Sequence, residues 1–282
     1  MPNRNLFAIS DLHVNYRENR EIAEALVPDT PNDWLLVVGD VAHQVEEIEA
    51  VLRRLRSRFN TVLFTPGNHD LWSRSDDGVN LRGAYRYRHL VDICRRLDVL
   101  TPEDPYPIWR DGQGDVAVAP LFLLYDYTLR PDHMTKEDAM AAARAASVVC
   151  SDELLLAADP YPSREAWCRD RLAYTRSRLD ALPPGLRTVL AAHWPLHPGP
   201  VGRLRYPAFS PWCGTRATAD WHVRYRAVAS VHGHLHIPIT ESYDGVRHEE
   251  VSLGYPRERR ARTRPVHYGL RRILPESTPK PA

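Results

Sequence analysis

Three short apolar segments in the first 70 residues constrain the fold of this chain more than any other feature. Each segment is almost entirely apolar and each is followed by a cluster of polar residues; they cover 6–9, 34–38 and 61–65. Runs of this kind are typical of strands buried on both faces of a parallel sheet. Between them, apolar residues spaced three or four apart predict a helix over 45–59, and 21–26 indicates a shorter one. We therefore expect an α/β fold, whose ligands bind at the carboxyl ends of the strands.

Later segments continue the alternation of strands and helices. The turn residues Asp244 and Gly245 predict a hairpin, because Asp-Gly favours a two-residue turn between strands. Further strands are predicted over 116–124, 188–192 and 227–231, and the two strands of the hairpin over 237–243 and 246–253.

Two helical insertions, about 83–112 and 128–185, interrupt the series of strands. Thr135 and Asp138 have the spacing of a capping box at a helix N-terminus. The insertions could cover the face that carries the polar clusters or only thicken the domain. We expect one domain over 1–272 and a flexible tail over 273–282, which is polar and rich in proline. The predicted helices of the insertions cover 83–97, 135–150 and 163–182.

Charge balance and cysteine spacing exclude several classes of protein. Lys and Arg number 37 and Asp and Glu 36, so the net charge of +1 creates no field that recruits nucleic acid or a membrane. The 4 cysteines are widely spaced without a CxxC pair, which indicates reduced thiols. No apolar run approaches the roughly 18 residues of a membrane span, and the amino terminus does not resemble a signal peptide. We expect a soluble, cytoplasmic protein with neither nucleic acid nor a membrane as partner.

The polar clusters at the predicted strand ends share one chemistry. Carboxylate, imidazole and amide side chains recur there, and these groups bind Zn, Mn, Fe or Ni in proteins. The absence of cysteine argues against a structural zinc finger. The donors are too many for one open catalytic ion and suffice for two ions that share a carboxylate. They are Asp11, His13, Asp40, Asn68, His193, His234 and His236.

These motifs resemble the pattern of the calcineurin-like metallophosphoesterase superfamily, which is DxH, GD, GNH(D/E), H and GHxH. All five motifs are intact and span most of the chain. The resemblance implies a four-layered α/β sandwich of two mixed sheets and two divalent or mixed-valence transition metal ions, with Mn or Fe favoured over Zn or Ni. It also implies two ligand sets bridged by Asp40: Asp11, His13, Asp40 and His236 for one ion, and Asp40, Asn68, His193 and His234 for the other.

His69 follows a metal ligand in the third motif but is not needed as a ligand itself. We expect it to be catalytic and to protonate the leaving oxygen of a phosphoester. Asp70 could orient the His69 ring, which would also make it part of the catalytic group, or it could cap a helix that begins at Leu71.

Four further segments resemble one branch of the superfamily, the phosphopantetheinyl hydrolases; they are 122–127, 211–215, 218–222 and 249–258. This resemblance implies a phosphodiesterase that removes 4′-phosphopantetheine from the serine of an acyl or peptidyl carrier protein and leaves apo carrier. A small-molecule phosphomonoesterase or a cyclic-nucleotide phosphodiesterase is the alternative function. A non-catalytic scaffold is a remote third, because a scaffold would have lost metal ligands.

Substrate contacts are expected from side chains near the motifs, namely His197, Arg203, Arg205 and His222. The arginine-rich segment 257–264 could attract an acidic carrier protein, although such stretches are more often simply solvated. The sequence leaves its role open.

Overall fold

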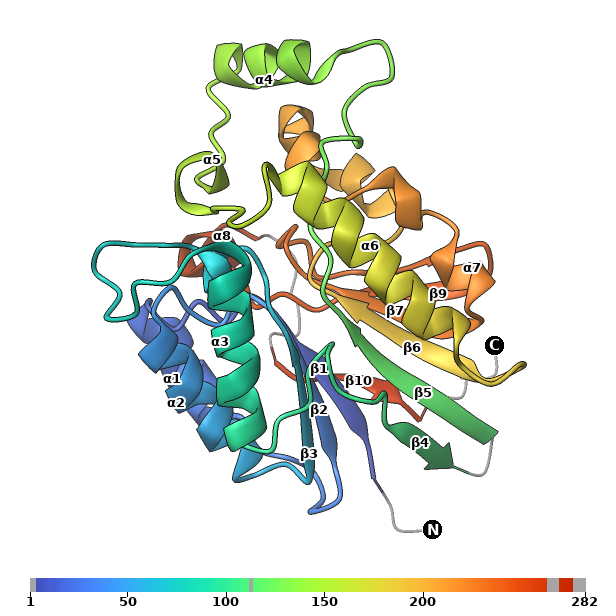
Figure 1. The fold of residues 1–282 in the computed structure, drawn as a ribbon. Coiled ribbons are helices and arrows are strands. Elements are labelled where there is room, and N and C mark those ends of the chain that lie inside the picture. The colour runs from blue at the N-terminus through green and yellow to red at the C-terminus, as the bar shows by residue number, and fades with distance from the viewer. Residues whose placement is uncertain (1–3, 112–113, 263–268, 276–282) are drawn as a thin grey trace.

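The computed structural model describes residues 4–111, 114–262 and 269–275, and its strands form two sheets that pack face to face (Figure 1). In the first sheet three neighbouring strands are parallel, and the fourth, at one edge, is antiparallel to the strand beside it. Its order is β10 (Arg271–Leu274), β1 (Leu6–Ile9), β2 (Trp34–Val38) and β3 (Thr61–Thr65). β1, β2 and β3 have the bounds that their apolar runs predict.

The second sheet has four parallel strands flanked by two antiparallel ones. Its order is β4 (Ile108–Asp111), β5 (Gly114–Leu121), β6 (Arg187–Ala192), β7 (Ala227–His232), β9 (Val246–Glu250) and β8 (Thr240–Tyr243). Asp244 and Gly245 form the turn between β8 and β9, as predicted.

Helices cover the outer face of each sheet, so the molecule has four layers (Figure 1). The first sheet is covered by α1 (Arg17–Ala25), α2 (Val45–Arg56) and α3 (Gly83–Arg96), and the second by α6 (Arg164–Asp180) and α7 (Trp221–Arg224). The remaining helical elements are α4 (Lys136–Ala145), α5 (Asp152–Leu155), α8 (Pro256–Ala261) and the 3₁₀ turns η1 (His69–Leu71), η2 (Gly199–Arg203), η3 (Pro207–Trp212) and η4 (Arg216–Thr218). This confirms the four-layered sandwich of two mixed sheets.

Two apolar cores hold the layers together. One lies between the sheets and includes Leu36 and Val38 from the first and Val118 and Val189 from the second, all almost fully buried. The other lies between the sheets and the helices that cover them. No helix in the described part of the chain is long and apolar enough to cross a membrane. The four cysteines are buried and free.

Several predicted bounds were wrong. β5 ends at Leu121 rather than at 124, and the Phe122 carbonyl accepts a hydrogen bond from Arg171 of α6. The helix predicted over 135–150 begins with the expected Thr135–Asp138 capping box but ends at Ala145, because Ser147 adopts a left-handed φ of 56°.

The two edge strands β4 and β10 were not expected from the sequence. β4 lies inside the first insertion and pairs with β5. β10 contains Ile273 and Leu274, which were assigned to a flexible tail; pairing with β1 leaves them only 0% and 3% exposed. The rest of the expected tail, 276–282, lies outside the described residues.

Candidate metal centre and catalytic residues

The expected metal ligands lie together at the carboxyl ends of strands from both sheets. They follow β1, β2, β3, β6 and β7 in the chain. Because parallel strands end at the same edge of a sheet, residues far apart in sequence meet there. The structure therefore brings all of the expected ligands into one cluster, in which most side chains are buried.

Asp11, His13 and His236 form one half of this cluster. The Asp11 Oδ1 atom lies 2.9 Å from Nε2 of His236 and 3.8 Å from Nε2 of His13. The Nε2 atoms of the two rings are 3.2 Å apart. The three side chains could hold one metal ion.

Asp40, Asn68, His193 and His234 form the other half. The Asn68 Oδ1 atom lies 3.1 Å from His193 Nε2 and 3.2 Å from His234 Nδ1. The Asp40 Oδ2 atom lies 3.5 Å from His193 Nε2, and 3.9 Å from His13 Nε2 in the first half. Asp40 therefore lies between the two groups of donors, as a bridging carboxylate would.

The charges in the cluster fit cations. Burial alone would raise the pKa of Asp11 and Asp40, but neighbouring histidines outweigh burial and hold both pKa values well below the usual range. Burial lowers the pKa of His13 to about 4 and that of His234 to about 3, so these rings are neutral. The Nε2 atom of His234 is buried without a hydrogen-bond partner among the described residues. Burial would lower the pKa of His193 and His236 as well, but the carboxylates beside them outweigh burial and raise the pKa of His193 to about 9 and that of His236 well above the usual range, so a metal ion would displace a proton from each of these two rings. Ionised carboxylates with imidazoles are the donor set of a transition-metal site.

Residues outside the donor set fix the orientation of the donors. His236 Nδ1 lies 2.7 Å from a Glu258 carboxylate oxygen, and His193 Nδ1 lies 2.9 Å from the Val38 carbonyl. The Ser10 and Ser252 hydroxyls both donate to Asp11 Oδ2, at 2.6 and 2.7 Å. Such partners select the ring nitrogen or carboxylate oxygen that faces a metal.

The backbone is strained where the donors lie. For a residue with a side chain, a left-handed backbone conformation costs on the order of 1–3 kcal/mol. Strain of this kind persists only where the surrounding contacts hold it in place. In this chain φ lies between 42° and 68° at Asp11, His13, Asp40, His234 and His236.

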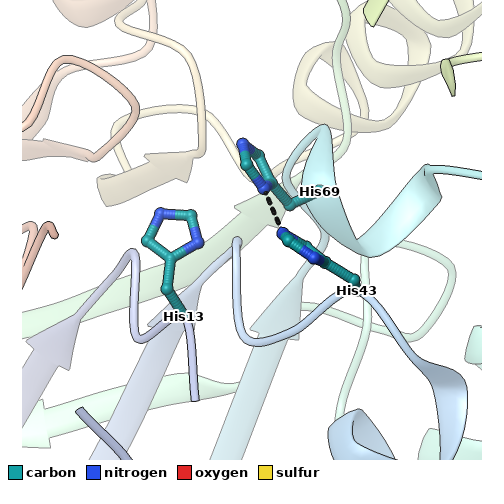
Figure 2. A group of neighbouring side chains, drawn as sticks. All are labelled: His13, His43 and His69. Carbon is teal, nitrogen blue, oxygen red and sulfur yellow. Dashed lines mark hydrogen bonds between the residues drawn. The ribbon is translucent and has the colours of Figure 1, made fainter. Parts of the chain in front are cut away.

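His69 is next to the donors and forms a hydrogen bond with a second histidine, His43. His69 Nδ1 lies 2.8 Å from Nε2 of His43, which follows β2, and Figure 2 shows this pair beside His13. The Trp72 ring stacks on His69 with a centroid separation of 3.7 Å, and the Tyr255 hydroxyl lies 3.4 Å from His69 Nε2. The His69 ring is therefore held on one side, and its Nε2 atom is 3.8 Å from Asp40 Oδ2.

Asp70 does not orient the His69 ring and does not cap a helix. Its carboxylate accepts backbone N–H hydrogen bonds from Asp40 at 2.7 Å, Val41 at 2.8 Å, Ala42 at 3.3 Å and Gly67 at 2.9 Å. These donors belong to the loops after β2 and β3, so Asp70 joins the two loops that carry Asp40 and Asn68. The Asp70 carboxylate is thus occupied by backbone N–H groups and not by the His69 ring.

A hollow of ≈ 730 Å³ borders the cluster, and four of the donors, Asp40, Asn68, His234 and His236, line it together with His69. Of the four residues expected to contact substrate, Arg205 lines it. The other three have partners elsewhere: Arg203 pairs with Glu241, His222 Nε2 lies 3.0 Å from Asp244 Oδ2, and the His197 ring packs on Tyr243 at 4.4 Å. These contacts place His197, Arg203 and His222 against the β8–β9 hairpin rather than among the residues that line the hollow.

Sequence reasoning missed His43, Asp152, Tyr255 and Glu258 as parts of the site. His43 lies three residues after Asp40 on the same loop, so its position in the sequence could have revealed it. Tyr255 and Glu258 lie within a segment singled out only for its resemblance to one branch. Asp152, which accepts a hydrogen bond from Asn68, comes from the second insertion and gave no sequence signal.

Comparison with known proteins decides the family. The calcineurin-like phosphoesterase family model matches residues 5–238. The chain belongs to the calcineurin-like phosphoesterase family. It is also 50% identical over 272 residues to the acyl-carrier-protein phosphodiesterase PptH of Mycobacterium tuberculosis, an alignment that covers 96% of this chain and 83% of that protein.

A solved structure and one further relative are also similar to this chain. The crystal structure of the phosphopantetheinyl hydrolase PptH from Mycobacterium tuberculosis superimposes with a TM-score of 0.95 at 49% identity and covers 99% of each chain. A symmetrical bis(5′-nucleosyl)-tetraphosphatase of Nitrosospira multiformis is 28% identical over 158 residues, which are 45% of this chain and 58% of that protein. The metallophosphoesterase fold expected from the five motifs is thus confirmed.

Proposed function

We propose that this chain hydrolyses the phosphodiester that joins 4′-phosphopantetheine to the serine of a carrier protein, and so returns holo carrier to apo carrier. The observation that carries the proposal is the 50% identity, over nearly the whole chain, to an acyl-carrier-protein phosphodiesterase. The clustering of the expected donors, four of which (Asp40, Asn68, His234 and His236) line one hollow, supports it.

The proposed metal ligands are those of the two halves of the cluster. Asp11, His13 and His236 would hold one ion, Asn68, His193 and His234 would hold the other, and Asp40 lies where both ions would share its carboxylate. Two bound transition metal ions supply Lewis acidity that activates water and neutralises charge on the phosphoryl oxygens. Manganese or iron suits the mixture of imidazole and carboxylate, and zinc or nickel is the alternative.

His69 is the proposed general acid. Water oxygen forms a bond to phosphorus, the bond from phosphorus to the serine oxygen breaks, and His69 Nε2 gives a proton to that oxygen; the proton lost by water is released. A serine alkoxide is a poor leaving group, so proton donation lowers the barrier. Burial lowers the pKa of His69 in the free protein, and the negative charge of a bound diester acts in the opposite direction.

His43 and Asp70 act through other residues. The hydrogen bond of His43 with His69 Nδ1 fixes the ring so that Nε2 faces the hollow. Asp70 holds the backbone of the loops after β2 and β3, which keeps Asp40 and His69 in register. Both are proposed as positioning residues.

Mass spectrometry of holo carrier proteins incubated with the manganese-loaded protein tests the proposal. We expect the carrier to lose the mass of phosphopantetheine and free 4′-phosphopantetheine to appear. Parallel reactions with p-nitrophenyl phosphate and a cyclic nucleotide test the alternative functions. If several carriers stay fully holo while either small substrate is cleaved, the alternative takes the place of the proposal.

A further inference from the structure

The hollow over the metal cluster has an apolar wall and a charged rim. Leu204 and Phe209 reach it from the loop between β6 and β7, and Leu235 and Ile237 from the segment after β7. Arg205, Arg257 and Arg262 also line it. Arg262 donates to the carbonyl of His236, whereas Arg257 is exposed and lies over the ring of Tyr255 at 5.3 Å.

A second hollow, of ≈ 560 Å³, lies between α1 and α8. Tyr255 and Arg257 line both hollows, so the two meet at these residues. The remaining lining is mostly charged, and Pro256 is the one aliphatic side chain among its described residues; it consists of Tyr16, Arg17, Glu18, Glu21, Pro256 and Arg260. The two hollows therefore differ in chemistry.

One end of the cluster contacts a residue that both hollows share, and the other end contacts a residue of the first hollow alone. His69 Nε2 lies 3.4 Å from the Tyr255 hydroxyl, and the Tyr255 ring packs against Tyr16 at 5.6 Å, inside the second hollow. At the other end, the Phe209 ring stacks on His234 at 5.9 Å. A general acid must lie beside the leaving oxygen, so the serine of a diester belongs on the Tyr255 side.

We propose that the two hollows separate the two arms of the substrate, with the pantetheine arm on the apolar wall of Leu204 and Phe209 and the carrier protein over Tyr16, Tyr255 and Arg257. The inference rests on the proposed function. A pantetheine arm carries no charge beyond its phosphate and exposes methyl and methylene groups, which suits the apolar wall. The acidic surface of a carrier suits an exposed guanidinium.

The arginines of the segment 257–264 differ in what they contact. Arg259 is held by the Asn19 side chain at 2.7 Å and by the Gly254 carbonyl at 2.9 Å, and Arg260 pairs with Glu18 at 2.6 Å. Both side chains stabilise the attachment of α8 to α1. Arg264 lies outside the described residues. Arg257 is thus the member of the segment whose charge faces both hollows.

Binding of the two reaction products separates the arms without turnover. Unmodified carrier protein carries only the serine side of the diester, and free 4′-phosphopantetheine carries only the other side. Their dissociation constants are measured by calorimetry with the manganese-loaded protein. The test variants are Arg257→Glu for the carrier side and Phe209→Ala and Leu204→Ala for the pantetheine side.

We expect Arg257→Glu to weaken binding of the carrier by about tenfold, with a larger effect at low salt, and to change phosphopantetheine binding less than twofold. Phe209→Ala and Leu204→Ala should weaken binding of phosphopantetheine by about tenfold and change binding of the carrier less than twofold. Arg176→Glu on α6 and Leu154→Ala on α5 are matched controls, because both side chains are exposed and line neither hollow. Thermal unfolding checks that each variant is folded.

Three results overturn the inference. The first is that Arg257→Glu weakens the affinity for phosphopantetheine as much as the affinity for the carrier. The second is that Phe209→Ala or Leu204→Ala weakens the affinity for the carrier as much as the affinity for phosphopantetheine. Equal binding by all variants overturns it too. The proposed function fails separately, if the unchanged protein does not release phosphopantetheine from holo carriers at all.

Discussion

The side-chain amide of Asn68 donates a hydrogen bond to Asp152 Oδ1 across 2.9 Å, although Asp152 lies in α5 of the second insertion. The same oxygen accepts a hydrogen bond from the Trp72 indole at 2.7 Å. Because the amide nitrogen is engaged, the Asn68 oxygen points at His193 and His234. The insertion therefore does more than thicken the domain, since it sets which amide atom faces the proposed metal site.

Asp152→Ala should consequently weaken the metal site by about 10 to 100-fold, as loss of an orienting partner commonly does. Asp152→Asn keeps an acceptor oxygen and should retain most of the affinity. Metal content after dialysis against graded chelator, alongside the melting temperature, checks this. A fall in melting temperature with unchanged metal affinity would show that Asp152 only stabilises the fold.

Asp40→Asn should remove metal and activity together while the fold survives. The substitution removes the charge that both halves of the cluster share, and the carboxylate is the proposed bridge. Elemental analysis and circular dichroism measure the two outcomes. Near-normal turnover with full metal occupancy would contradict the bridging assignment.

The strands and donors could be predicted because both depend on short-range sequence. Each donor follows its strand within a few residues, so a buried apolar run and the motif after it locate strand and site together. His43 could have been predicted in the same way, because it too follows its strand within a few residues. The hydrogen bonds of Glu258 to His236 and of Asp152 to Asn68 could not be predicted, because tertiary packing brings these residues together over 22 and 84 positions.

Predictions that relied on proximity in sequence alone were the weaker ones. His197 comes soon after the motif residue His193, and His222 is the last residue of the branch-specific segment 218–222, yet both rings contact the β8–β9 hairpin instead. Asp70 was expected to orient His69 because the two residues are adjacent. Its carboxylate instead accepts hydrogen bonds from backbone N–H groups of two loops. Polar side chains find partners that depend on how loops fold over one another, and a single sequence does not specify this.

Stability should fall with acidification partly because of His248 on β9. Burial, followed by repulsion from His222 and His197, lowers the pKa of His248 to about 3; Asp244 acts in the opposite direction. The unfolded chain, with a pKa near 6.5, binds the proton more readily, so this contribution is full above pH 6.5 and is lost as the pH falls toward 3.

His248→Phe should flatten the pH dependence of the free energy of unfolding in that interval by up to about 1.4 kcal/mol per pH unit. Urea unfolding in chelator, with both proteins measured at several pH values from 7 to 4, compares the slopes. Parallel slopes for the two proteins would mean that His248 takes up its proton equally in the folded and unfolded states.

His69→Ala separates proton donation from metal binding. The ring lies beside Asp40 but outside the proposed donor set, so both metal ions should stay bound. Hydrolysis of esters with poor leaving groups, such as the serine of a carrier, should fall by about 100 to 10,000-fold, the usual contribution of a general acid. Aryl diesters should lose much less, because a nitrophenolate leaves without a proton. Turnover of holo carrier and of bis(p-nitrophenyl) phosphate by the same preparation gives the comparison, with metal content measured in parallel. Equal losses on both substrates would indicate that His69 stabilises charge or positions the phosphate, and the proton would then have to come from another group that borders the hollow, of which the Tyr255 hydroxyl is the nearest to His69.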